Sequence, residues 1–175
     1  VDELSQTVFK STPEQAAAAA AAALAEGFAP AAIGEAISLA AAKATIEEMR
    51  EKNVVAHLWE QGQRLKDGYH ILAREHGVAN YTQCAGLPPH TVVMFQDAQG
   101  RESLEMKSLF MQECLKRGIL FSGVQNTCFS HSPADIDMTL RVYNTALEIL
   151  ADAIRQGTVR EKLEGAPVEP VFRRA

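Results

Sequence analysis

The sequence lacks any long run of large apolar residues. Its longest apolar run, residues 16–24, is almost entirely alanine and falls far short of the ~20 residues that cross a bilayer. Residues 1–10 show no charged segment followed by an apolar one, the pattern of a secretory signal. These absences favour a cytoplasmic protein with no membrane partner.

The chain also has few cysteines and no basic patch. Its net charge is −5 with acids and bases interspersed, and the Arg173–Arg174 pair is too short to bind nucleic acid. Cys84, Cys114 and Cys128 are odd in number and widely spaced, which indicates reduced thiols. Cys128-x-x-His131 lacks a second pair of ligands, so we predict no metal site.

Helix start and stop signals divide the chain into five predicted helices. Thr12 and Gln15 suit a capping box around Pro13, and Ser132 with Asp135 marks another strong helix start. Gly77, Gly118 and Gly157 supply stops. The expected helices are residues 13–26, 30–52, 54–76, 103–117 and 132–157.

Short strands are expected between the later helices. Residues 78–87 and 91–95 read as two strands split by a Pro88–Pro89 turn. Residues 119–121 and 127–129 read as two more, around a polar turn at 122–126. Long helices mixed with short strands predict an α+β fold.

The helix at residues 54–76 carries an apolar stripe, which predicts core packing. Gly62 lies on that stripe and predicts the close approach of another element. His57, His70 and His76 share the helix, and we expect them on solvated faces because none are four residues apart. The residues of the stripe are Leu58, Gly62, Leu65, Tyr69 and Leu72.

Two segments resemble a known enzyme family. Residues 38–68 (SLAAAKATIEEMREKNVVAHLWEQGQRLKDG) and 107–140 (KSLFMQECLKRGILFSGVQNTCFSHSPADIDMTL) are similar to the C-terminal small domain of class III pyridoxal-phosphate (PLP) aminotransferases, especially glutamate-1-semialdehyde aminomutases. The resemblance implies the small domain of a fold-type-I PLP enzyme over residues 34–175, with a short sheet packed on long helices. Residues 1–33 form an unrelated Ala-rich helical extension.

The family places its cofactor in a large domain, on a lysine upstream of a segment similar to Gly34–Ala41 (GEAISLAA). Lys10 is the one lysine upstream of that segment here, and its context differs from the family's motif. Ala36 stands where the family commonly has a threonine that binds the cofactor phosphate across the dimer interface. We therefore predict no catalytic and no cofactor-binding residue, and no covalently bound PLP.

The resemblance leaves one candidate site, a substrate pocket at Gln125 and Asn126. The alternative is that both are ordinary turn residues, because asparagine is favoured in turns. It implies amino-group transfer on a small amino acid or semialdehyde, as part of a homodimer with a large domain that this fragment lacks. The alternative is a noncatalytic helical or α+β association module.

Overall fold

A computed structural model describes residues 12–169, and Lys10 and the Arg173–Arg174 pair lie outside them. The chain divides into two compact units, residues 1–55 and 56–175. The predicted boundary between residues 33 and 34 falls inside the helix Pro30–Glu51. It was drawn where the resemblance to the enzyme family begins, and it stays a prediction. No helix within residues 12–169 has the length and apolarity to cross a membrane.

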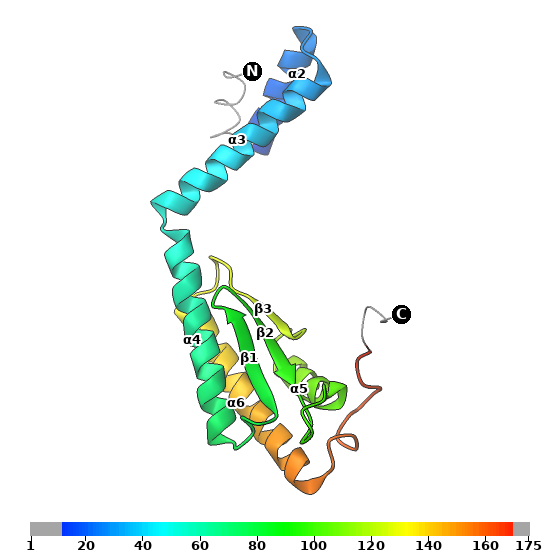
Figure 1. The fold of residues 1–175 in the computed structure, drawn as a ribbon. Coiled ribbons are helices and arrows are strands. Elements are labelled where there is room, and N and C mark those ends of the chain that lie inside the picture. Colours follow the sequence, from blue (N-terminus) through cyan, green and yellow to red (C-terminus); the bar gives the residue numbers. More distant parts are fainter. Residues whose placement is uncertain (1–11, 170–175) are drawn as a thin grey trace. The chain divides into compact units, whose positions relative to one another are not determined.

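The first unit contains α2 (Pro13–Ala25) and α3 (Pro30–Glu51), which pack against each other (Figure 1). The predicted capping box is present: Thr12 Oγ1 accepts from Gln15 N at 3.3 Å, and Gln15 Oε1 accepts from Thr12 N at 2.9 Å. Buried side chains here are mostly small, such as Ala23, Ala36 and Ala40 beside Ile33. Asn53, with a φ of +50°, follows α3 in the left-handed conformation that asparagine tolerates.

The second unit combines helices with a small sheet (Figure 1). Its elements are α4 (Val54–Glu75), β1 (Thr82–Leu87), β2 (His90–Phe95), α5 (Leu104–Lys116), β3 (Val124–Asn126) and α6 (Pro133–Gln156). The strands lie in the order β1-β2-β3, all antiparallel, with Cys84 opposite Val93 and Thr91 opposite Gln125. The predicted α+β class is confirmed over the described residues.

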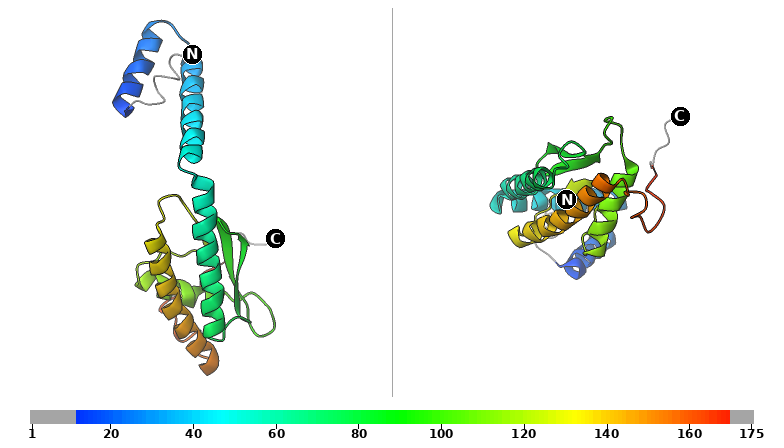
Figure 2. Two further views of the ribbon diagram at one scale, coloured as in Figure 1. Left: turned by 90° about the vertical axis from the view of Figure 1, so that its left-hand side faces the viewer. Right: turned by 90° about the horizontal axis from the view of Figure 1, so that it is seen from below.

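The helices lie on one side of this sheet (Figure 2). Alternate strand residues point toward them and are buried, among them Cys84, Val93 and Phe95. Tyr69, Phe110 and Tyr143 come from α4, α5 and α6 and meet with ring centroids 5.2–6.0 Å apart. This aromatic cluster is the centre of the core.

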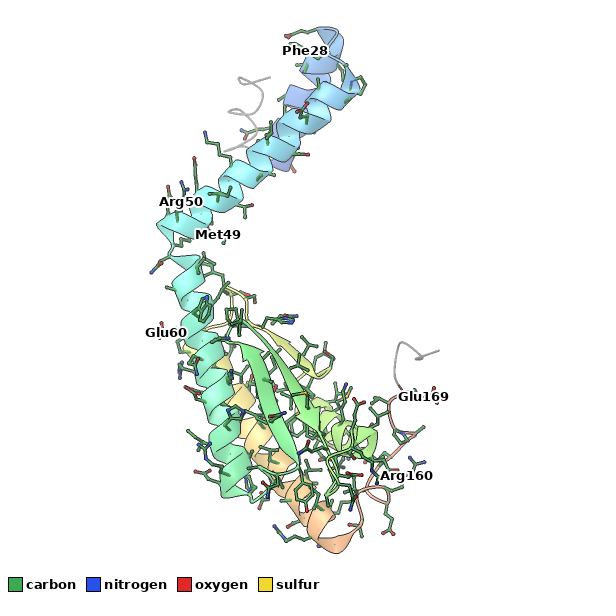
Figure 3. The ribbon with its side chains drawn as sticks, viewed as in Figure 1. Phe28, Met49, Arg50, Glu60, Arg160 and Glu169 are labelled. Carbon is green, nitrogen blue, oxygen red and sulfur yellow. The ribbon has the colours of Figure 1, made fainter. Side chains whose placement is uncertain are left out.

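Helix α6 has the strongest local signals in the chain. Ser132 is the predicted N-cap and forms a capping box with Asp135, and Gly157 ends the helix with a φ of +69°. The segment after α6 carries Arg160 and Glu169 (Figure 3). It lies against α5, where Val168 N donates to Ser108 Oγ at 2.8 Å.

The strand predictions around residues 119–129 are wrong. The predicted turn at 122–126 contains the real strand β3, whereas residues 119–121 and 127–129 form no strand. Gly123, at a φ of +98°, provides the bend that precedes β3. Pairing of Val124 with Val92 and of Asn126 with His90 then overrides the turn preference of these polar residues.

Candidate functional site

A cavity of ≈ 280 Å³ lies beside β3 and the start of α6. Apolar residues such as Leu65, Ile119 and Phe121 form part of its wall. Both candidate pocket residues from the sequence line this cavity, together with other polar side chains. The polar set is Gln125, Asn126, Thr127, His131, Asp135, Thr139 and Tyr143.

Gln125 points into the core, and both its amide oxygen and its amide nitrogen form hydrogen bonds there. Its Oε1 accepts from Thr91 Oγ1 at 2.8 Å and from Cys84 Sγ at 3.6 Å, and its Nε2 donates to Tyr143 Oη at 3.0 Å. The residue is only 7% exposed. Gln125 therefore ties β1, β2 and α6 together, a structural role that its place in the sequence did not reveal.

Asn126 occupies the opposite, exposed face of β3. Its Oδ1 lies 2.6 Å from Nδ1 of His90, the residue directly across the sheet. An amide oxygen can only accept, so Nδ1 of His90 is the donor. The two amide protons of Asn126 have no partner among residues 12–169.

His131 sits in a tight turn before α6. Its Nδ1 accepts from Cys128 N at 3.1 Å, its backbone N donates to Cys128 O at 3.1 Å, and its carbonyl oxygen lies 2.9 Å from His57 Nε2. These contacts fix the turn that leads into α6. Within the described range no three His, Cys, Asp or Glu residues gather as metal ligands.

The expectation that His57 and His70 of α4, and His76 just beyond it, lie on solvated faces is wrong. His57, His70 and His76 are half-buried. His57 Nε2 pairs with the His131 carbonyl, His70 Nε2 accepts from Cys84 N at 3.1 Å, and His76 Nε2 lies 2.8 Å from Asn144 Oδ1. Each imidazole meets a group distant in sequence, which helical spacing alone does not indicate.

The ionisation of two cavity residues follows from their surroundings. Burial raises the pKa of Tyr143 well above its usual range, so its hydroxyl keeps its proton. The Ser132 side chain and backbone lower the pKa of Asp135, whose Oδ2 accepts from Ser132 N at 2.8 Å and Oγ at 2.7 Å. Asp135 is therefore ionised at neutral pH.

The described lysines do not fit a covalently held PLP, which needs an amine facing a cavity. None lines the cavity beside β3, the cavity of ≈ 950 Å³ between α5 and the C-terminal segment, or that of ≈ 690 Å³ between α4 and α6. Lys66 donates to Gly86 O at 2.7 Å, and Lys116 pairs with Glu113 and Glu164. Ala36 lies within α3, fully buried.

Comparison with known proteins gives one informative likeness. No protein-family model matches the chain, and no curated protein does. Nine solved chains are similar, among them the PLP internal aldimine form of the Sphingopyxis sp. MTA144 FumI protein. That match covers 69% of this chain with a TM-score of 0.59 and 20% identity, and it spans 28% of the FumI chain. The likeness shows the fold: residues of this chain are arranged like part of a PLP enzyme.

Proposed function

We propose that this chain is the C-terminal part of a class III PLP-dependent aminotransferase or aminomutase. Its parent reaction is amino-group transfer on a small amino acid or semialdehyde. One observation carries the proposal, the match of 69% of this chain to 28% of a PLP enzyme. The order of the family-like segments along residues 34–175 supports it independently.

On this proposal residues 1–175 contribute a pocket wall and do not catalyse alone. PLP supplies an electron sink for amino transfer when it is bound, but it needs a lysine amine at its aldehyde carbon. None of the described lysines lines any of the three cavities, and several are engaged with carbonyl or carboxylate oxygens. The proposed partners are a large domain that supplies lysine and cofactor, and a second copy in a homodimer.

A noncatalytic association module is the second candidate, and exposed apolar side chains favour it. Leu120 is 88% and Leu87 64% exposed. The open face of the sheet carries Val92, Met94 and Val124 without a charged side chain among the strand residues that point outward. Such a face suits burial against another protein layer.

Adding PLP to the purified chain tests whether this chain binds the cofactor covalently by itself, which neither candidate function predicts. The chain is mixed with PLP, reduced with borohydride and analysed by mass spectrometry, while sedimentation reports its mass across concentrations. We expect no stoichiometric adduct at one lysine. An adduct at a single lysine, abolished by one Lys→Arg change, would refute the pocket-wall proposal. If the chain self-associates, and shows no cofactor-dependent chemistry when it is combined with a large domain of a PLP enzyme, the association module would be favoured.

A further inference from the structure

Helix α4 runs beside the edge strand β1 and contacts the strand and the turn after it at three successive helical turns (Figure 1). Four residues of a helix advance about 6 Å, and two residues of a strand advance about 6.6 Å, so steps of four on α4 match steps of two on β1. The matched positions are Gly62 with Pro88, Lys66 with Gly86 and His70 with Cys84. At an edge, alternate backbone groups have no strand partner, and α4 supplies hydrogen bonds to two of them.

These two hydrogen bonds run in opposite directions. Lys66 Nζ donates to Gly86 O at 2.7 Å, whereas His70 Nε2 accepts from Cys84 N at 3.1 Å. A backbone N–H can only donate, so Nε2 of His70 carries no proton and the neutral ring is protonated on Nδ1. A second proton on the imidazole would set one N–H against another. The bond to Cys84 therefore exists only while His70 is neutral.

The other two histidines of this region use the opposite role. Nε2 of His57 lies 2.9 Å from the His131 carbonyl oxygen, and Nε2 of His76 lies 2.8 Å from Asn144 Oδ1. Carbonyl and amide oxygens only accept, so both Nε2 atoms are donors, and they remain donors when the ring is charged. Acid therefore breaks the contact of His70 and leaves these two contacts in place.

The charged side chains of α4 near His70 do not favour a positive imidazole. Those within one turn of it are Lys66, Asp67 and Arg74. Lys66 and Arg74 are each four residues from His70, a spacing at which like charges repel. The single acid, Asp67, is exposed, and its Oδ1 already accepts from Gln63 Nε2 at 2.8 Å.

The strand that packs against His70 offers no acid either. Cys84 is the one titratable side chain of Thr82–Leu87, and burial raises its pKa, so the thiol is uncharged. The ring of Tyr69, 6.3 Å from that of His70, is also uncharged because burial raises its pKa. The turn at residues 76–81 contains no aspartate or glutamate. A charge on His70 thus gains no carboxylate partner from β1 or from this turn.

We propose that the bond between His70 and Cys84 is a pH-sensitive latch that fastens the edge of β1 to α4. The latch is closed while the imidazole is neutral. It opens as the pH falls through the range in which imidazoles titrate, about pH 8 to 5. Opening leaves the Cys84 N–H without its acceptor, while Lys66 still holds Gly86 O because its ammonium is charged throughout this range.

NMR of the purified chain tests the latch. Nitrogen shifts at pH 8 should find His70 protonated on Nδ1, and His76 on Nε2. Hydrogen exchange of the Cys84 amide is then compared at pH 8 and pH 5 with that of Val93, which donates to Gly123 O elsewhere in the sheet. Each rate is divided by that of an unstructured peptide at the same pH. We expect the protection of Cys84 to fall at least fivefold more than that of Val93.

Two results with the parent chain would overturn the proposal. One is a neutral His70 protonated on Nε2, because that ring could not accept from Cys84. The other is a fall in protection at Cys84 less than fivefold greater than that at Val93, because a change shared by both amides is no local opening. Neither measurement needs PLP or a partner chain, so the outcome does not depend on the proposed function.

Matched variants assign the titration to one ring. His70→Gln places an amide oxygen near the position of Nε2 and does not titrate, so the relative protection of Cys84 should change less than twofold between pH 8 and pH 5. His76→Gln, whose parent ring donates to Asn144, is the control and should keep the pH dependence of the parent. A full pH dependence in His70→Gln, or its loss in His76→Gln, would contradict the latch.

Discussion

A β-carbon at Gly62 would lie 2.0 Å from the carbonyl oxygen of Pro88, so α4 meets the turn between β1 and β2 through backbone atoms. Backbone cannot move aside as a side chain can. We predict that Gly62→Ala lowers the free energy of unfolding by roughly 1–3 kcal/mol, measured by urea denaturation.

Two other glycines are controls for that substitution. A β-carbon at Gly68 would meet only the Leu140 side chain at 2.6 Å, which can rotate, so Gly68→Ala should cost less. Gly34 has open space around it in α3, and Gly34→Ala should stabilise its helix by up to about 1 kcal/mol. Gly62→Ala unfolding at the parent's urea midpoint would contradict this close contact.

Gln125 should matter more for folding than its neighbour. Gln125→Leu keeps the side-chain size but removes the acceptor of Thr91 and the donor to Tyr143. The loss should lower the free energy of unfolding by roughly 2–4 kcal/mol. Asn126→Ala, at the exposed face of the same strand, should change it by about 0.5 kcal/mol or less. Equal effects in urea denaturation would show that the buried network is unimportant.

Glu113 predicts a dependence of stability on acid pH. Burial raises the pKa of Glu113, but hydrogen bonds from Gln112, Arg117 and Lys116 together lower it by more. The net pKa therefore lies below the ordinary value of 4.5. A depressed folded-state pKa stabilises the fold above the unfolded-state pKa, and this stability disappears as the pH falls through the folded-state value.

Glu113→Gln should therefore destabilise the fold by about 1–3 kcal/mol at pH 7 and flatten the loss of stability below pH 4.5. Urea unfolding of both proteins from pH 7 down to pH 3 measures the difference. Asp152→Asn, which removes an exposed pair with Arg155, is the control and should leave the acid limb unchanged. Parallel curves for the parent and Glu113→Gln would exclude this role.

The three cysteines should separate by reactivity. Cys128 is exposed, whereas Cys84 and Cys114 are buried. Burial raises the pKa of Cys84, and it raises that of Cys114 to about 12, so neither forms the reactive thiolate at neutral pH. A thiol reagent at pH 8 should label one equivalent quickly and two more only in denaturant. Cys128→Ser should abolish the fast equivalent, and fast labelling of two or three would show an open core.

The sequence predicts the helices of this fold well because their signals are local. Thr12 and Ser132 cap within three residues, and Gly157 stops α6, so the observed bounds lie close to the predicted ones. Gly62 is also confirmed as a point of close approach, because a glycine on an apolar helix face leaves room for a neighbouring backbone.

The site required contacts that no local pattern contains. Strand β3 forms because Gln125 pairs with Thr91, 34 residues earlier, and the Gln125 amide meets Tyr143 from α6. The helical spacing predicts Tyr143 as a core residue, and nothing in that spacing marks it as part of a cavity wall. Helical spacing likewise predicts His70 as a surface residue, whereas in the structure its Nε2 accepts a hydrogen bond from Cys84 N of β1. The pocket role of Gln125 and Asn126 stays a prediction.

Turnover by the purified chain tests the central claim most directly. The 175-residue protein is incubated with excess PLP, a panel of small amino acids and a semialdehyde acceptor, and amino transfer is followed by mass spectrometry of the products. We predict no transfer above that of free PLP, because none of the described lysines lines any of the three cavities beside β3, beside α5 or between α4 and α6. Saturable transfer by this chain alone, abolished by one lysine substitution, would contradict it.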